Sequence, residues 1–179
     1  MIRKNKLKKN FKNKKLQIGT WSSIPILNII DVLGTTNLDF VIIDMEHGSV
    51  SYETLEGMVR AAYSTSITPI VRLSSSSENE ILRVLETGVQ SIMIPHINSV
   101  EKAKTVSEYC KYRPLGKRGL SPYTFSHKYT HQNLDKSLQN NNKENFLGIL
   151  VEGKEGLDNL DEICKVPNID VIYLGLFDI

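Results

Sequence analysis

Short apolar runs alternate with amphipathic segments along most of this 179-residue chain. An uninterrupted run such as Val41–Ile43 is typical of a parallel strand that is buried on both faces. Apolar residues three and four positions apart, as at Leu55, Met58 and Val59, are typical of a helix. A chain that repeats strand and helix in this way builds a parallel sheet, because each helix returns the chain to the same end of the sheet. The sequence therefore predicts an α/β fold.

Six strands are expected, at residues 16–21, 40–44, 68–73, 91–95, 146–152 and 170–174. Ser51, Ser77 and Ser99 are placed to cap three of the helices between them. Glu80 stands three residues after Ser77, which is the capping-box pattern. Residues 113–145 break the rhythm and predict a long loop with one short helix. Further helices are expected at 24–33 and through Leu157, Leu160, Ile163 and Cys164.

The ends of successive strands recur at regular intervals. In the sequence, 28 positions separate Asp44 from Arg72, and 26 separate Glu152 from Asp178. Each interval holds one strand, one helix and two loops, so these ends meet on one rim, as at the mouth of a (β/α)8 barrel. An open doubly wound sheet shares the repeat, but no glycine-rich phosphate loop follows the first strand. We expect a TIM-barrel type fold over residues 16–179 with six of its eight strands present, as in the N-terminal part of a longer protein.

The first 15 residues carry eight Lys and Arg and no acidic residue, whereas the remainder carries 14 basic and 20 acidic residues. Such an arm could bind nucleic acid or a membrane surface. We expect instead a lead-in helix over residues 1–15, with Leu7 and Phe11 packed against the bottom of the barrel and no nucleic-acid or membrane partner. No apolar run approaches the roughly 20 residues that span a bilayer. Cys110 and Cys164 are isolated, which favours free thiols and a cytoplasmic location.

Two acidic residues follow apolar strands in neighbouring strand–helix units. Glu152 and Asp178 would face each other on the rim, and such carboxylates repel unless a cation or a proton lies between them. Oxygen ligands favour Mg²⁺ or Mn²⁺, although two solvated loop acids would give the same pattern. His127 and His131 stand four residues apart, but no third ligand at suitable spacing accompanies them, so a zinc site is disfavoured.

The second strand ends in a cluster of residues that can carry chemistry. Asp44 near His47 could fix the orientation of the imidazole and leave its other nitrogen free as an acid or base. Arg72 ends a buried strand, where its charge needs an anion: either a bound carboxylate or enolate, or an internal ion pair with Asp44 or Glu46. Trp21 would line the pocket or pack beside it.

Taken together, the ordered motifs resemble those of the HpcH/HpaI aldolase family, the metal-dependent pyruvate aldolases. The resemblance covers the chain from Leu16 onward and favours the barrel over the open sheet. The matching stretches are Ile18–Trp21, Asp39–Gly48, Pro69–Arg72, Ile92–Pro95, Arg113–Gly119, Val151–Glu152, Leu157–Ile163 and Gly175–Asp178.

The resemblance implies a site and a reaction. Glu152 and Asp178 would bind Mg²⁺ or Mn²⁺, His47 oriented by Asp44 would be the acid/base, and Arg72 would neutralise an enolate. The implied reaction is the cleavage of a 4-hydroxy-2-oxo acid to pyruvate and an aldehyde by a class II aldolase. Its partner would be this small-molecule substrate, and intact family members form homo-oligomers.

The chain departs from the family pattern beside the implied metal ligands. Leu150 stands where the family usually has Gln, and Gly153 where it has Thr. The positions that shape the pyruvate pocket read Gly175-Leu176-Phe177, without the usual Pro. Two other functions remain open: a CoA-thioester lyase of the citrate lyase β-subunit type, and a non-catalytic truncated fragment that acts only as an interaction protein.

Overall fold

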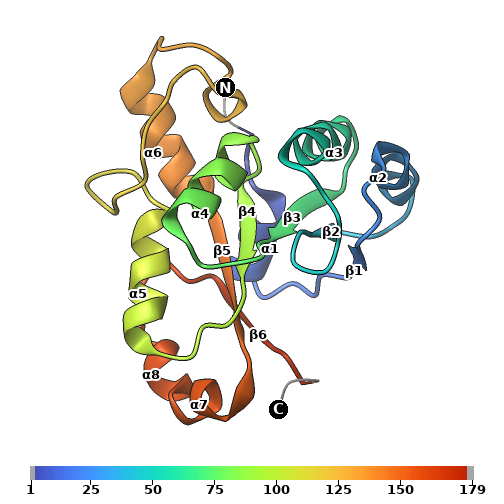
Figure 1. The fold of residues 1–179 in the computed structure, drawn as a ribbon. Helices are drawn as coiled ribbons and strands as arrows, with labels where there is room; N and C mark the ends of the chain where they lie inside the picture. The colour runs from blue at the N-terminus through green and yellow to red at the C-terminus, as the bar shows by residue number, and fades with distance from the viewer. Residues whose placement is uncertain (1–2, 177–179) are drawn as a thin grey trace.

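The computed structural model describes residues 3–176. Its centre is a single sheet of six strands in the order β1-β2-β3-β4-β5-β6, and every neighbouring pair is parallel (Figure 1). The strands are β1 (Gly19–Ser22), β2 (Phe40–Asp44), β3 (Thr68–Arg72), β4 (Ser91–Ile94), β5 (Phe146–Val151) and β6 (Val171–Leu174). The sheet is curled, since Trp21 on β1 contacts Tyr173 on β6 with ring centroids 5.8 Å apart. The expectation of an α/β fold of barrel type with six strands is confirmed.

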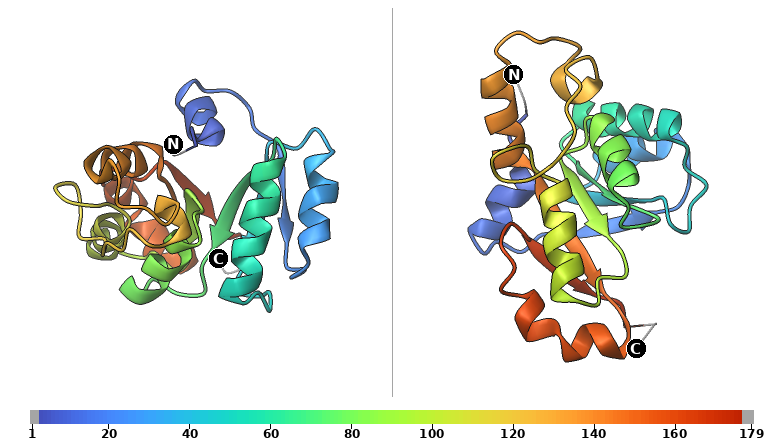
Figure 2. Two further views of the ribbon diagram at one scale, coloured as in Figure 1. Left: turned by 90° about the horizontal axis from the view of Figure 1, so that it is seen from above. Right: turned by 60° about the vertical axis from the view of Figure 1, so that its left-hand side comes forward.

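Helices cover the outer side of the curled sheet (Figure 2). They are α2 (Leu27–Gly34), α3 (Tyr52–Ser64), α4 (Glu78–Glu86), α5 (Val100–Tyr109), α6 (Leu134–Glu144), α7 (Gly153–Asp158) and α8 (Leu160–Ile163), with the 3-10 turn η1 (Phe125–His127). The side chains of Ser51, Ser77 and Ser99 each accept a hydrogen bond from a backbone N–H in the first turn of the helix that follows. The expected capping box is only half formed, because the Glu80 carboxylate accepts from Ser74 instead.

Alternate residues of each strand enter two different cores. Val41 and Ile43 point outward into the large cluster between sheet and helices, whereas Ile42 points inward. The inner cluster consists of Leu7, Ile42, Ile70, Met93, Phe146 and Leu150. Leu7 comes from α1 (Lys6–Lys12), is 1% exposed, and closes one end of the curled sheet. Burial on both faces explains why the strands read as continuous apolar runs.

The helix expected through Leu157 and Cys164 is interrupted. Asn159 lies between α7 and α8 with φ −96° and ψ 1°, outside the helical range. Its side-chain amide donates to the carbonyl of Asn98. Asn commonly breaks a helix in this way, because its side chain offers an alternative hydrogen bond close to the backbone. Within residues 3–176, no helix is both long and apolar enough to cross a bilayer.

Candidate active site

Arg72 and Asp44 end neighbouring strands and pair directly in the β2–β3 register. Nε of Arg72 donates to Oδ1 of Asp44 at 2.9 Å, and Nη2 donates to Oδ2 at 2.6 Å. Burial alone would raise the pKa of Asp44, but hydrogen bonds from Arg72 and from the backbone hold this pKa below its ordinary value. Burial alone would lower the pKa of Arg72, and the Asp44 carboxylate raises it instead. The internal ion pair considered from the sequence is therefore formed.

The guanidinium also touches a second carboxylate and an aromatic ring. Nη1 of Arg72 lies 3.0 Å from Oε2 of Glu46, an ion pair that lacks hydrogen-bond geometry. The indole of Trp21 faces the same guanidinium, whose central carbon lies 4.6 Å from the ring centroid. Trp21 thus packs on Arg72 at the strand ends, where a cation and an aromatic face attract each other.

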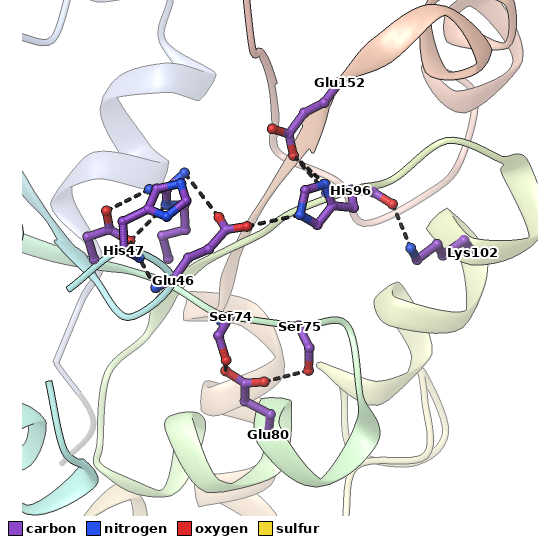
Figure 3. Close-up of polar contacts among 10 residues, drawn as sticks. Glu46, His47, Ser74, Ser75, Glu80, His96, Lys102 and Glu152 are labelled. Atoms are coloured by element: carbon purple, nitrogen blue, oxygen red, sulfur yellow. Dashed lines mark hydrogen bonds and ion pairs between the residues drawn. The ribbon is translucent and has the colours of Figure 1, made fainter. Parts of the chain in front are cut away.

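His96 connects two carboxylates that follow different strands (Figure 3). It follows β4, and its Nε2 lies 2.9 Å from Oε1 of Glu46. Its Nδ1 lies 3.2 Å from Oε1 of Glu152, and its backbone N–H donates to the same oxygen at 2.9 Å. Sequence reasoning missed His96, although its position one residue after a predicted strand was a usable signal.

The resulting chain of contacts crosses four strand ends. It runs from Asp44 through Arg72, Glu46 and His96 to Glu152. The side chains of His96's four companions in this chain are at most 12% exposed, whereas that of His96 is 61% exposed. The carboxyl ends of parallel strands are where α/β folds gather their reactive groups, and this line of charges occupies that edge.

His47 lies on the exposed turn after β2. Its backbone N–H donates to Oδ1 of Asp44 at 3.2 Å, and that of Glu46 donates to the same oxygen at 3.0 Å. Among the described residues, the His47 imidazole makes no hydrogen bond with Asp44. The carboxylate therefore fixes the turn that carries His47, rather than the ring itself.

Glu152 is the predicted metal ligand that the structure describes; its predicted partner Asp178 lies outside the described residues. The side chain of Glu152 is 9% exposed, with Oε1 held by His96. A Cβ built on Gly175 would stand 3.0 Å from Cγ and 3.2 Å from Oε2 of Glu152, so this glycine keeps space open beside the carboxylate. Leu176, the other predicted substrate residue, is 77% exposed. Glu152 offers a buried carboxylate with one oxygen that accepts no hydrogen bond within residues 3–176, and an oxygen of this kind is the ligand type that a hard divalent ion takes.

The described residues alone, those at the strand ends included, do not complete a metal site. No cluster of three or more His, Cys, Asp or Glu side chains within residues 3–176 is arranged to hold an ion. Both ring nitrogens of His127 are occupied, by the hydroxyls of Tyr112 at 2.8 Å and Ser137 at 2.9 Å. His131 is exposed beside Tyr123.

A cavity of about 620 Å³ lies away from these strand ends, between α3, α4 and residues 123–129. Its Arg60 already donates to Glu56 and to the Tyr129 hydroxyl and stacks on Phe125. These contacts fasten the long loop to α3. We therefore place the candidate site at the strand ends, where charged groups are buried and converge.

Solved structures share this fold. An HpcH/HpaI aldolase/citrate lyase family protein from Burkholderia cenocepacia J2315 superposes with a TM-score of 0.90 at 22% identity, over 95% of this chain and 68% of that one. An HpcH/HpaI aldolase from Desulfitobacterium hafniense DCB-2 gives a TM-score of 0.87 at 25% identity, covering 94% and 65%. The citrate synthase SbnG gives a TM-score of 0.86 at 31% identity, covering 97% and 66%.

The sequence is similar to a 2-keto-3-deoxy-L-rhamnonate aldolase from Shigella boydii serotype 4 (strain Sb227), with 29% identity over 175 residues. The match takes in 98% of this chain, which spans 65% of the length of that relative. Residues 17–179 match the family model of the HpcH/HpaI aldolase/citrate lyase proteins. The motifs, the curled parallel sheet and these likenesses agree, and the chain belongs to the HpcH/HpaI aldolase/citrate lyase family.

Proposed function

We propose that the protein is a divalent-metal-dependent (class II) aldolase that cleaves a 4-hydroxy-2-oxo acid to pyruvate and an aldehyde. The observation that supports this most is the buried guanidinium of Arg72, joined through Glu46 and His96 to the carboxylate of Glu152 at the strand ends. A metal-dependent retro-aldol reaction needs positive groups to receive the charge of an enolate and a carboxylate to bind the metal ion.

Glu152 and Asp178 would bind Mg²⁺ or Mn²⁺. The bound ion would supply Lewis-acid polarisation of the 2-oxo group and the substrate carboxylate. The space that Gly175 leaves beside Oε2 of Glu152 supports this assignment. Gly175 and Leu176, which follow β6, would border the pyruvate moiety, and Trp21 would form a wall beside it.

Arg72 has donors left for a substrate. A guanidinium carries five N–H groups, and Arg72 commits only Nε and one N–H of Nη2 to hydrogen bonds with Asp44. Nη1 pairs with Glu46 but makes no hydrogen bond within residues 3–176, so its N–H groups would turn to an enolate oxygen while the ion pair is kept. A donor of this kind contributes about 3 kcal/mol to the stabilisation of a developing oxyanion.

The proton transfers fall to His47. Its imidazole would take the C4 hydroxyl proton through a water, and the electron pair of that O–H bond would form the aldehyde carbonyl. The C3–C4 bond breaks, and its electron pair passes to C3 and the 2-oxo oxygen as an enolate. Protonation at C3 then gives pyruvate. The partner that we propose is a small-molecule 2-oxo acid substrate. We also propose that the intact protein is a homo-oligomer in the cytoplasm.

The test is pyruvate release from 2-keto-3-deoxy-L-rhamnonate and related 4-hydroxy-2-oxo acids, followed by coupled reduction with lactate dehydrogenase. Activity should disappear with EDTA and return with Mg²⁺ or Mn²⁺. Glu152→Gln should abolish it, whereas Glu155→Gln, an exposed neighbour on α7, should leave it intact. A folded chain that releases no pyruvate from any of these acids with either metal would refute the proposal.

The likeness to the citrate synthase SbnG favours a second candidate, a lyase that acts on a CoA thioester. Both reactions break a carbon–carbon bond and leave an enolate, so the same strand-end cation would serve either one. Incubation with citryl-CoA separates them: release of a CoA thioester without pyruvate from the 2-oxo acids would select the second candidate.

A further inference from the structure

We infer that His96 is a positioning residue for Glu152. It holds one oxygen of the Glu152 carboxylate, so that the other oxygen faces a divalent ion. The inference deepens the proposed metal-dependent reaction and rests on it. Neither the motifs nor the family resemblance singled out His96, and the geometry of its contacts carries the argument.

Oε1 of Glu152 is contacted by two groups of the same residue, one of which is a hydrogen-bond donor. The backbone N–H of His96 donates to it at 2.9 Å, and the ring Nδ1 lies 3.2 Å away (Figure 3). Oε2 accepts no hydrogen bond among residues 3–176 and lies on the side where Gly175 lacks a Cβ. These two contacts orient Oε1 and leave Oε2 free of hydrogen bonds within residues 3–176, as suits a ligand that binds an ion through one oxygen.

The backbone of His96 is adapted to this contact. Its φ is +57°, a left-handed conformation that residues with a Cβ seldom adopt and that is enriched at functional sites. The ammonium of Lys102, on α5, donates to the His96 carbonyl at 2.6 Å and holds the turn in place. This turn directs both the N–H and the ring of one residue at one oxygen.

The same ring reaches the anion-binding part of the site. Nε2 of His96 lies 2.9 Å from Oε1 of Glu46, whose other oxygen lies 3.0 Å from Arg72. The His96 imidazole thus lies between the Glu152 carboxylate, which would bind the ion, and the Glu46 carboxylate. Glu46 in turn contacts the guanidinium that would receive the enolate charge. Groups that orient a metal ligand in this way typically change metal affinity about 10- to 100-fold when they are removed.

The test measures Mn²⁺ affinity by isothermal titration calorimetry on the full chain, without substrate. His96→Gly permits the positive φ and retains the N–H, so it removes only the ring, and its Mn²⁺ affinity should fall about 10-fold. His96→Asn also tolerates this backbone conformation and restores a side-chain donor, so it should recover part of the loss. His131→Ala, which removes an exposed histidine from the long loop, is the matched control and should bind as the native chain does.

Thermal unfolding of each variant separates positioning from a general loss of structure. A weaker Mn²⁺ affinity in His96→Gly with an unchanged Tm, and recovery in His96→Asn, supports the inference. Equal affinity in His96→Gly and the native chain overturns it and leaves the proposed aldolase standing. A native chain that binds no Mn²⁺ overturns both proposals. A loss of affinity in His131→Ala equal to that in His96→Gly overturns the inference alone.

Discussion

The carboxylate of Asp44 and the guanidinium of Arg72 meet edge to edge across adjacent strands, joined by hydrogen bonds of 2.9 and 2.6 Å. Two parallel hydrogen bonds of this kind fix the plane of the guanidinium as well as its position. The arginine can then present its remaining N–H groups in a defined direction. Each partner also compensates the buried charge of the other, so the pair should contribute to the stability of the fold.

Arg72→Met should lower the free energy of unfolding by about 3 kcal/mol, because it leaves the buried carboxylate of Asp44 without its partner. Urea denaturation followed by circular dichroism measures the change. Lys154→Met provides the comparison, since Lys154 pairs with Asp158 on the exposed surface of α7. That variant should lose less than about 1 kcal/mol, and equal losses in the two would contradict the prediction.

The ion pair should also make stability depend on pH in a defined window. The pKa of Asp44 in the folded protein lies below its ordinary value of 3.8, so the unfolded chain binds the proton more readily. The stabilisation is fully present above pH 3.8 and is lost as the pH falls from there through the folded pKa. Thermal unfolding of the native chain and Asp44→Asn between pH 6 and pH 2.5 should show their difference in stability shrinking only in the acid part of this range.

Leu7→Ala should destabilise the fold by about 2–5 kcal/mol, because Leu7 fills the inner core of the curled sheet. Leu16→Ala is a matched control, since Leu16 is 83% exposed and makes little buried contact. Chemical denaturation compares the two. If Leu7→Ala unfolds at the same denaturant concentration as Leu16→Ala, α1 does not help to close the inner core.

Gly175→Ala should weaken Mn²⁺ binding about 10-fold without unfolding the protein, because the new methyl group would crowd Oε2 of Glu152. Gly119→Ala is the control: its Cβ would meet only the flexible side chain of Leu82, at 3.3 Å. Titration calorimetry gives both affinities. Native affinity in Gly175→Ala would show that the ion approaches Glu152 from another side.

The repeat of strand and helix was predictable because burial on both faces of a parallel strand leaves a continuous apolar run, as at Val41–Ile43. The caps at Ser51, Ser77 and Ser99 were predictable because each depends only on a hydrogen bond to a residue three positions later in the sequence. Contacts between distant residues were harder to predict. The sequence left the anion of Arg72 open between a bound ligand and an internal carboxylate, because both satisfy a buried charge.

His96 escaped prediction because its role depends on a left-handed backbone and on the register that brings Glu46 and Glu152 to either side of it. Neither is encoded in a local pattern. The break at Asn159 was missed for a related reason, since the apolar spacing on both sides of it continues as if the helix did. The pairing of Glu152 with Asp178 stays a prediction, because Asp178 lies outside the described residues.

Trp21 is the only tryptophan in the sequence, and its indole lies against both Arg72 and Tyr173. Its emission is therefore an intrinsic optical probe of two events at once. Separation of β1 from β6 would move the ring away from Tyr173, and an anion arriving at Arg72 would change the charge over the face of the ring. A shift in fluorescence on addition of pyruvate would report occupancy of the site without any label.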